Sequence, residues 1–478
     1  MSCNSGSINE FVPTPSNLWN KRSVQHFYRR AGFGASTNEI EQALVLTPSN
    51  FVDSIINEAL NLPMATPPSW FEMVESDYTN IDEQIPEQHK ELYLIWEKEM
   101  LENPIRGRFT LFWSNHFVTR LEDYWCPSWM YNYYSILQQY TFGNFKEFVK
   151  AIGLSPAMLI FLNGYQNSAT EPNENYAREL YELFTLGVNN GYTQNDIVET
   201  AKALTGYTAI NEYCAPIGFD INDFDNSSKT IFGKTGDWGY NDVINILFEE
   251  RGNEVATFIC EKLYKYFVSP EVDSIIVSKL AATLVANDFE LVPVYKQLFK
   301  SEHFFDDNAI GIVIKSPFDV FNIYFRETGF ATNTELLLNV IWLTSEIGQT
   351  LFEPIDVAGW QGNHDWINSS TLVGRWNAFE YYLWWIWEND NDSLRDFAVN
   401  LAGESNDPFV ITKIIVDHLL SNGLQTPTDY GIATAVFKDQ VPQNYFDNGT
   451  WNLQWDTVPY QVIVLLLYIV RLPEFQLK

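Results

Sequence analysis

The chain has 478 residues, 46% of them hydrophobic and 16% aromatic, so it can bury a large core rich in rings. Its 29 basic residues against 61 acidic ones give a formal net charge of −32, which repels phosphate backbones and argues against nucleic acid as a partner. A single core seldom grows to this length, so two lobes are expected.

The four cysteines, Cys3, Cys126, Cys214 and Cys260, lie far apart and form no C-x-x-C pair, so we expect reduced, mostly buried thiols. The amino terminus has neither a basic n-region nor an apolar h-region. We therefore expect no secretory signal and a cytoplasmic protein, with export by another route left open. The longest apolar run, 462–470, is too short to span a bilayer and predicts a buried C-terminal helix rather than a transmembrane segment.

Helical spacing of apolar residues dominates the first half of the chain. We expect an N-terminal coil over 1–22 and then an N-terminal helical lobe over 23–205. Ser36 with Glu39 predicts a capping box, and Asn103-Pro104 breaks one long helical pattern into two. Helices are also predicted over 23–30, 51–60, 128–139, 144–152, 156–162, 173–187 and 193–204.

Turn residues interrupt the helical pattern over 206–240, where five glycines stand among Asn and Asp residues. We expect an irregular connecting loop there, with room for short strands. The pattern then resumes as a C-terminal helical lobe over 241–478, interrupted by a second loop over 352–371 that contains Trp360 and His364-Asp365. The expected fold class is all-α, mainly helical, in two lobes joined by a long irregular or short-stranded loop.

The segment 172–187 crowds polar side chains onto a strong helical pattern: Asn173, Glu174, Asn175, Arg178 and Glu179. On one helix face, Arg178 lies between Glu174 and Glu182 at i, i+4 spacing. Glu174 or Glu179 is therefore a candidate general base or cation ligand, with Arg178 orienting it or an anionic substrate group, and with Asn173 and Asn175 as binding residues. The same pattern also fits a structural ion-pair network that packs this helix against its neighbours.

Two histidines are further candidates for proton transfer. His26 stands beside basic residues, including Arg30, which should lower its pKa and leave a neutral imidazole. Asn115 and His116 lie among aromatic residues in F-W-S-N-H-F, where a buried polar pair needs a reason. The alternative for each histidine is a core residue with satisfied hydrogen bonds.

Several longer motifs make the chain resemble the bacterial family called domain of unknown function 1800. The matching pieces are H-F-Y-R-R-A-G-F-G at 26–34, F-W-S-N-H-F at 112–117, G-N-F-K-E-F at 143–148, the block 172–196 and A-L-T-G-Y at 203–207. Weaker matches are K-S-P at 315–317, V-A-G-W at 357–360 and P-E-F-Q at 473–476. One departure is Phe224, which stands where members generally have His, although Asp225 and Lys229 are kept.

The resemblance covers nearly the whole chain and therefore implies one integrated, mainly helical domain. It implies no reaction, because the family has no assigned activity. Members are often encoded beside proteins that resemble the alkaline phosphatase and sulfatase superfamily, which implies such a protein as a partner.

From the residues we expect one polar pocket in which Asn173, Glu174, Asn175, Arg178 and Glu179 are approached by His26, Arg30, Asn115 and His116. Such a pocket favours hydrolytic or transfer chemistry. The rival hypothesis is a non-catalytic accessory or scaffold protein that docks a partner subunit through an acidic, Trp-rich surface. A third is a fold stabilised by a cation. The chain has no H-E-x-x-H, P-loop or dinucleotide fingerprint, so metal and cofactor stay unknown.

Overall fold

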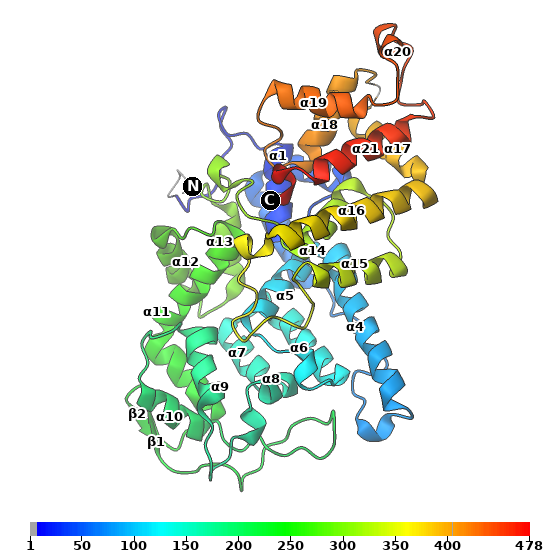
Figure 1. Ribbon diagram of the computed structural model, residues 1–478. Coiled ribbons are helices and arrows are strands. Elements are labelled where there is room, and N and C mark those ends of the chain that lie inside the picture. Colours follow the sequence, from blue (N-terminus) through cyan, green and yellow to red (C-terminus); the bar gives the residue numbers. More distant parts are fainter. Residues whose placement is uncertain (1–6, 404) are drawn as a thin grey trace.

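Helices build almost the whole molecule (Figure 1). The computed structural model describes residues 7–403 and 405–478, so Cys3 and the first residues of the predicted coil lie outside the described part. Within that part, a single two-stranded sheet accompanies the helices, between α10 and α11. The mainly helical fold class, with a short-stranded region near the middle, is confirmed.

The helices before the middle of the chain follow the predicted order. They are α1 (Lys21–Ala31), α2 (Thr37–Leu44), α3 (Pro48–Asn61), α4 (Ile81–Glu102), α5 (Pro104–His116), α6 (Pro127–Tyr140), α7 (Phe145–Gly153), α8 (Pro156–Phe161), α9 (Glu174–Glu179) and α10 (Gln194–Ala203). Short 3₁₀ turns lie between them at η1 (Glu75–Asp77), η2 (Leu121–Asp123) and η3 (Gly164–Gln166).

Local signals set several of these boundaries. The predicted capping box of α2 is present, because the Ser36 hydroxyl accepts from the Glu39 N–H while the Glu39 carboxylate accepts from the Ser36 N–H. Thr193 and Asp196 cap α10 in the same way. The break at Asn103-Pro104 separates α4 from α5, since proline at the first helical position needs no backbone donor.

The predicted helix over 173–187 is only partly α-helical. After α9 the chain widens into the π-helix η4 (Leu180–Thr185), where the Leu186 N–H donates to the Tyr181 carbonyl at 2.8 Å. Gly187, with φ of +94°, follows directly. The carbonyls of the last turn are thereby left without helical partners and are available to other elements.

The second half repeats the helical pattern after the hairpin of β1 (Lys229–Ile231) and antiparallel β2 (Lys234–Gly236). Its helices are α11 (Tyr240–Phe267), α12 (Ser274–Ala286), α13 (Leu291–Lys300), α14 (Pro317–Thr328), α15 (Thr334–Glu346), α16 (Ser369–Asn389), α17 (Asn391–Ala402), α18 (Pro408–Leu419), α19 (Pro427–Phe437), α20 (Gln443–Asp447) and α21 (Val458–Val470). Short turns are η5 (Asp307–Ala309), η6 (Asn363–Trp366) and η7 (Pro473–Gln476). The predicted buried C-terminal helix is α21.

Two hydrophobic clusters form the core. The first joins α1 to α13 with Phe318 and with four residues of the segment between α15 and α16. The second joins α14 to α21 and forms the upper part of the view in Figure 1. Helices on both sides of the predicted 206–240 boundary share the first cluster, and the division into lobes at that loop stays a prediction.

A buried ion pair lies where the two clusters meet. Arg29 of α1 donates through Nε and Nη2 to both carboxylate oxygens of Glu327 in α14, at 2.6 and 2.7 Å. Both side chains are 1% exposed. The same guanidinium also donates to the Ser421 hydroxyl and the His418 carbonyl, so α1 is tied to both α14 and α18.

One expectation about the cysteines is wrong. Cys126 and Cys214 form a disulfide, with Cα atoms 5.7 Å apart and a sequence separation of 88. Folding brings the start of α6 against the 206–240 segment, which no spacing rule could reveal. Cys260 is a free, buried thiol, as expected.

Candidate functional site

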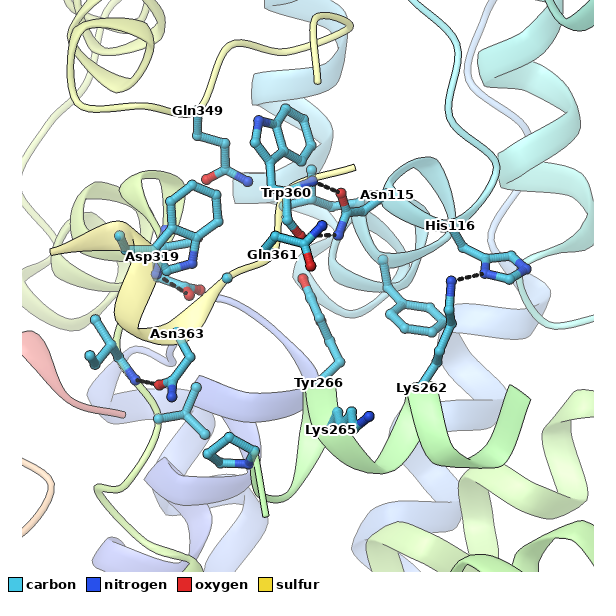
Figure 2. Close-up of a pocket in the computed structure, with 18 of the residues that line it drawn as sticks. Asn115, His116, Lys262, Lys265, Tyr266, Asp319, Gln349, Trp360, Gln361 and Asn363 are labelled. Carbon is cyan, nitrogen blue, oxygen red and sulfur yellow. Dashed lines mark hydrogen bonds between the residues drawn. The ribbon is translucent and has the colours of Figure 1, made fainter. Parts of the chain in front are cut away.

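A cavity of about 440 Å³ lies between α5, α11, the start of α14 and the segment 358–366. Its polar lining is formed by Asn115, His116, Glu261, Lys262, Lys265, Tyr266, Ser316, Asp319, Gln349, Gln361, Asn363 and Lys478. The apolar lining includes the aromatic side chains of Phe112, Phe258, Trp360 and Trp366. An aromatic cavity with a few inward-facing polar groups is typical of a small-molecule site (Figure 2).

Asn115 holds the Trp360 segment, which forms one wall of this cavity, by hydrogen bonds. Its amide oxygen accepts from the Trp360 N–H at 2.7 Å, and its amide nitrogen donates to the Trp360 carbonyl at 3.0 Å. The neighbouring Gly359 has φ of +77°, and an added Cβ there would lie 2.3 Å from the Asn115 amide oxygen. A glycine is therefore required for this close approach, and the motifs F-W-S-N-H-F and V-A-G-W meet in one contact.

His116 is buried behind the same wall. Its Nε2 lies 3.0 Å from the Phe184 carbonyl, which accepts only, so Nε2 carries the proton and Nδ1 keeps a lone pair. That lone pair faces the Lys262 Nζ at 3.2 Å. Burial and the nearby Lys262 hold the pKa of His116 well below its ordinary value, so the imidazole is neutral.

Lys262 of α11 is the cation of the cavity without an acidic partner. Its Nζ donates to His116 Nδ1 and to the Leu183 carbonyl at 3.3 Å, and it stands 4.9 Å from the centre of the Phe258 ring. Among the described residues, no carboxylate lies within ion-pair distance of it. Burial and the neighbouring Lys265 lower the pKa of Lys262 to about 8. The Leu183 carbonyl of η4, which accepts from Lys262, supplies only a partial negative charge.

The other charges that line the cavity are paired. Lys265 lies 2.6 Å from Glu261 on the rim of the cavity. Asp319 accepts from Arg108 and Lys478, and from the Ser316 N–H at 2.8 Å. Burial alone would raise the pKa of Asp319, but the two cations outweigh it and hold that pKa well below its usual range. In a chain of strongly negative net charge, the cavity lining thus carries one excess positive charge.

Hydrogen-bond donors prevail among the remaining polar groups. The amide oxygens of Gln349 and Asn363 are occupied by backbone N–H groups of Phe318 and Ile314, at 3.3 and 3.2 Å, which leaves their NH₂ groups as donors. The Tyr266 hydroxyl accepts from Arg108 at 3.3 Å and keeps its own proton to donate. These groups suit a ligand rich in acceptors.

The predicted residues of the Asn173 block lie outside this lining. Glu174, Arg178 and Glu182 form the expected ladder on α9 and η4, with Arg178 2.9 Å from Glu174 and 3.4 Å from Glu182. These three side chains are between 21% and 39% exposed, so the ladder lies near the surface. Burial, with the nearby Glu182, raises the pKa of half-buried Glu179, and Arg178 opposes that rise.

The two asparagines of the block have structural contacts. The Asn173 side chain caps α9 by accepting from the Asn175 N–H at 2.9 Å. The Asn175 amide donates to the Leu162 carbonyl at 3.0 Å. The block nevertheless reaches the cavity through its backbone, because the carbonyls of Leu183 and Phe184 hold Lys262 and His116.

His26 and Arg30 lie elsewhere, on the buried side of α1. His26 Nε2 is bonded to the Phe304 carbonyl at 2.9 Å, and burial with the nearby Arg30 holds the pKa of His26 well below its ordinary value. Arg30 donates to the carbonyls of Val268 and Ala309. His26 lines a second cavity of about 390 Å³ between α1 and α18. The structure therefore brings His116 to the end of the Asn173 block, joins Asn115 to Trp360, and places His26 and Arg30 elsewhere.

Sequence reasoning did not select Lys262, Tyr266 or Gln349. In E-K-L-Y-K-Y-F the lysine has the pattern of an ordinary helix surface, since Glu261 and Lys265 stand beside it. Only packing reveals that it faces the cavity with no carboxylate within ion-pair distance among the described residues. The predicted loop over 352–371 does line the cavity through Trp360, whereas its His364 and Asp365 are exposed and lie outside the lining.

Over residues 7–403 and 405–478, no three His, Cys, Asp or Glu side chains are grouped so that they could hold a metal ion. In the same part of the chain, no helix is both long and apolar enough to cross a membrane.

Comparison with known protein families assigns the chain to one of them. The family described as "Protein of unknown function (DUF1800)" matches residues 26–477, so the chain belongs to that family, as its motifs suggested. Searches of curated proteins and of solved structures each found no match.

Proposed function

We propose that the protein binds a small organic anion in the cavity between α5, α11, α14 and the segment 358–366. The observation that carries this proposal is the Lys262 ammonium, which faces an aromatic cavity without a carboxylate to neutralise it. Keeping an uncompensated cation in a partly buried place costs free energy, because burial disfavours the charged form. An anionic ligand would recover that cost on binding.

The donors around the cavity support the same proposal. Gln349, Asn363 and Tyr266 each have their acceptor atom occupied and a proton left to give. A carboxylate or phosphate group accepts several hydrogen bonds at once, whereas a cationic ligand would meet an excess positive charge in the lining. The cavity also has the volume of an ordinary small-molecule site.

The test compares the wild type with Lys262→Met in a thermal-shift screen of small carboxylic acids and phosphate esters, followed by calorimetry. We expect binding by the wild type and at least a tenfold weaker affinity in the variant, because the ion pair is lost. The matched control is Lys265→Met, which removes a neighbouring cation of the same helix that already has Glu261 as a partner. Equal losses in both variants, or no binding of any anion, would reject the proposal.

Hydrolytic or transfer chemistry is a narrower proposal for the same cavity. His116 is neutral and both of its nitrogens are engaged, so proton transfer would fall to Lys262, whose pKa of about 8 suits an acid or base near neutral pH. In that case turnover of a bound ester should fall with Lys262→Met and persist in Glu179→Gln. The reverse result would return the reaction to the Asn173 block.

Docking of a partner subunit is a second candidate function, supported by the exposed aromatic residues of α15 and α16. Trp342 is 60% exposed and Tyr381 is 56% exposed, on two helices that pack side by side (Figure 1). In this proposal the partner is the sulfatase-like or alkaline-phosphatase-like protein that the family resemblance implies. Replacing both residues by serine should abolish co-purification while anion binding in the cavity is unchanged.

The cellular location is also a matter of proposal. The sequence predicts a cytoplasmic protein, but a disulfide between Cys126 and Cys214 is typical of an oxidising compartment. We therefore favour export by the other route that the sequence left open. Trapping thiols in intact cells should find both cysteines oxidised; reduced cysteines in cells would restore the cytoplasmic prediction.

A further inference from the structure

We infer that the ligand is an elongated monocarboxylate whose far end carries an uncharged hydrogen-bond acceptor, such as an amide or a hydroxyl group. This inference rests on the proposed anion binding and names the class of ligand. It is drawn from the unequal polar ends of the cavity and the aromatic stretch between them, all visible in Figure 2.

The Lys262 end fits a group with a single negative charge. Lys262 is the one lining cation without an acidic partner among the described residues, and the other two are paired with Glu261 and Asp319. His116 turns its only lone pair toward Lys262, so it has no proton to offer an anion there. One cation with no second charged donor matches a carboxylate better than a phosphate with two negative charges.

The opposite end offers neutral donors. Gln349 and Asn363 lie on the far side of the view from Lys262, near the start of α14 (Figure 2). Their NH₂ groups are free, since their oxygens accept from Phe318 and Ile314. Gln349 is 3% exposed, so its NH₂ group can donate only to what occupies the cavity.

The charges at that far end do not call for a second anion. Asp319 and Lys478 line it and are paired with each other, and Asp319 also accepts from Arg108. An anion placed there would have to compete with the Asp319 carboxylate for Lys478. The negative group of a ligand therefore belongs at Lys262, and its neutral acceptor belongs at Gln349 and Asn363.

The middle of the cavity is aromatic. Trp360 and Tyr266 lie between the two ends (Figure 2), and Phe112 and Trp366 also line the cavity. A chain or ring of carbon atoms that links the two polar groups would bury its surface against these side chains, at roughly 25 cal/mol per Å². This stretch explains why a ligand should be elongated rather than a compact, uniformly polar anion.

The experiment uses 6-acetamidohexanoate as the probe, with two half probes. Hexanoate lacks the amide, and N-hexylacetamide lacks the carboxylate. We expect the wild type to bind the full probe at least tenfold more tightly than either half probe, measured by calorimetry or ligand-detected NMR. Lys262→Met should bind the full probe and N-hexylacetamide equally.

A second variant addresses the far end. Gln349→Glu keeps an oxygen for the Phe318 N–H and replaces the free NH₂ donor by an acceptor, so the variant should bind the full probe no better than hexanoate. Unfolding curves of Lys262→Met and Gln349→Glu serve to check that both variants are folded. Asn363→Asp provides an independent second test of the far end.

The outcomes separate this inference from the proposed function. Equal affinity of the wild type for hexanoate and the full probe would overturn the inference while anion binding stands. Tighter binding of hexyl phosphate than of hexanoate would overturn the single-charge assignment. If N-hexylacetamide binds but neither hexanoate nor hexyl phosphate does, both the inference and the proposed function fail.

Discussion

Replacing Asn115 by alanine should release the segment that forms one wall of the cavity. The change removes two hydrogen bonds to the backbone of Trp360 and leaves that N–H and carbonyl without partners. Each hydrogen bond contributes about 1 kcal/mol net, and each buried group left unpaired costs about 1 to 3 kcal/mol. Water can enter through the cavity and satisfy part of this need, so we expect a loss of about 2 to 4 kcal/mol in local protection.

Gly359→Ala should weaken the same contact from the other side. Its φ of +77° is unfavourable for alanine by about 1 to 2 kcal/mol, and the added Cβ would lie 2.3 Å from the Asn115 amide oxygen. In the Asn115→Ala background that side-chain clash disappears, although the Asn115 carbonyl still lies 2.7 Å from the new Cβ. The double variant should therefore be less destabilised than the sum of the single variants, by about 1 kcal/mol or more.

Hydrogen exchange of residues 352–368 measures the local protection of this segment directly, and denaturant unfolding gives the global stability for reference. Exchange there should accelerate by about 30-fold or more in Asn115→Ala, while α3 keeps its protection. The control is Asn61→Ala, which removes an exposed asparagine whose amide donates to the Asn57 carbonyl on α3. Unchanged exchange in the loop, or strictly additive effects of the two changes, would refute the reasoning.

Three further predictions concern the rest of the fold. Cys126→Ala should lower the free energy of unfolding by up to about 4.6 kcal/mol, because the disulfide with Cys214 closes a loop of 88 residues; an unfolding midpoint that reductant does not move in the wild type would count against it. Glu327→Gln should cost about 3 to 5 kcal/mol in denaturant titration, since it leaves the Arg29 guanidinium buried without its carboxylate, and a cost below 1 kcal/mol would contradict this. Arg178→Met should cost less than about 1 kcal/mol, because its two ion pairs are about one-third exposed; a loss of several kcal/mol in thermal unfolding would mean that the ladder holds the fold together.

Local signals in the sequence predicted local structure well. Ser36 and Glu39 predict the start of α2, because the capping box forms within one turn of that helix. Pro104 predicts the start of α5, because a proline at the first helical position needs no backbone donor. The π-turn of η4 was not predictable, since it depends on how Leu180 to Gly187 pack rather than on a propensity.

The candidate site was predicted only in part, for a physical reason. Asn115 and His116 stood out because a polar pair among aromatic residues must find partners, and the structure shows those partners at Trp360 and Phe184. Lys262 did not stand out, because a lysine between Glu261 and Lys265 resembles a solvated helix face. Long-range packing decides which lysine has an acid nearby, and one sequence does not contain that information.

The pKa of Lys262 tests the central claim most directly. In the free protein its value of about 8 lies below the ordinary 10.5, so burial disfavours the charged amine and stability should rise as the pH increases from about 8 toward 10.5. A bound carboxylate favours the ammonium and should raise that pKa to about 9 or higher. Titration by NMR with selectively labelled lysine, without and with saturating 6-acetamidohexanoate, and with Lys262→Met for assignment, should show both values. A pKa near 10.5 in the free protein, or one that the probe leaves unchanged, would contradict an uncompensated cation that awaits an anion.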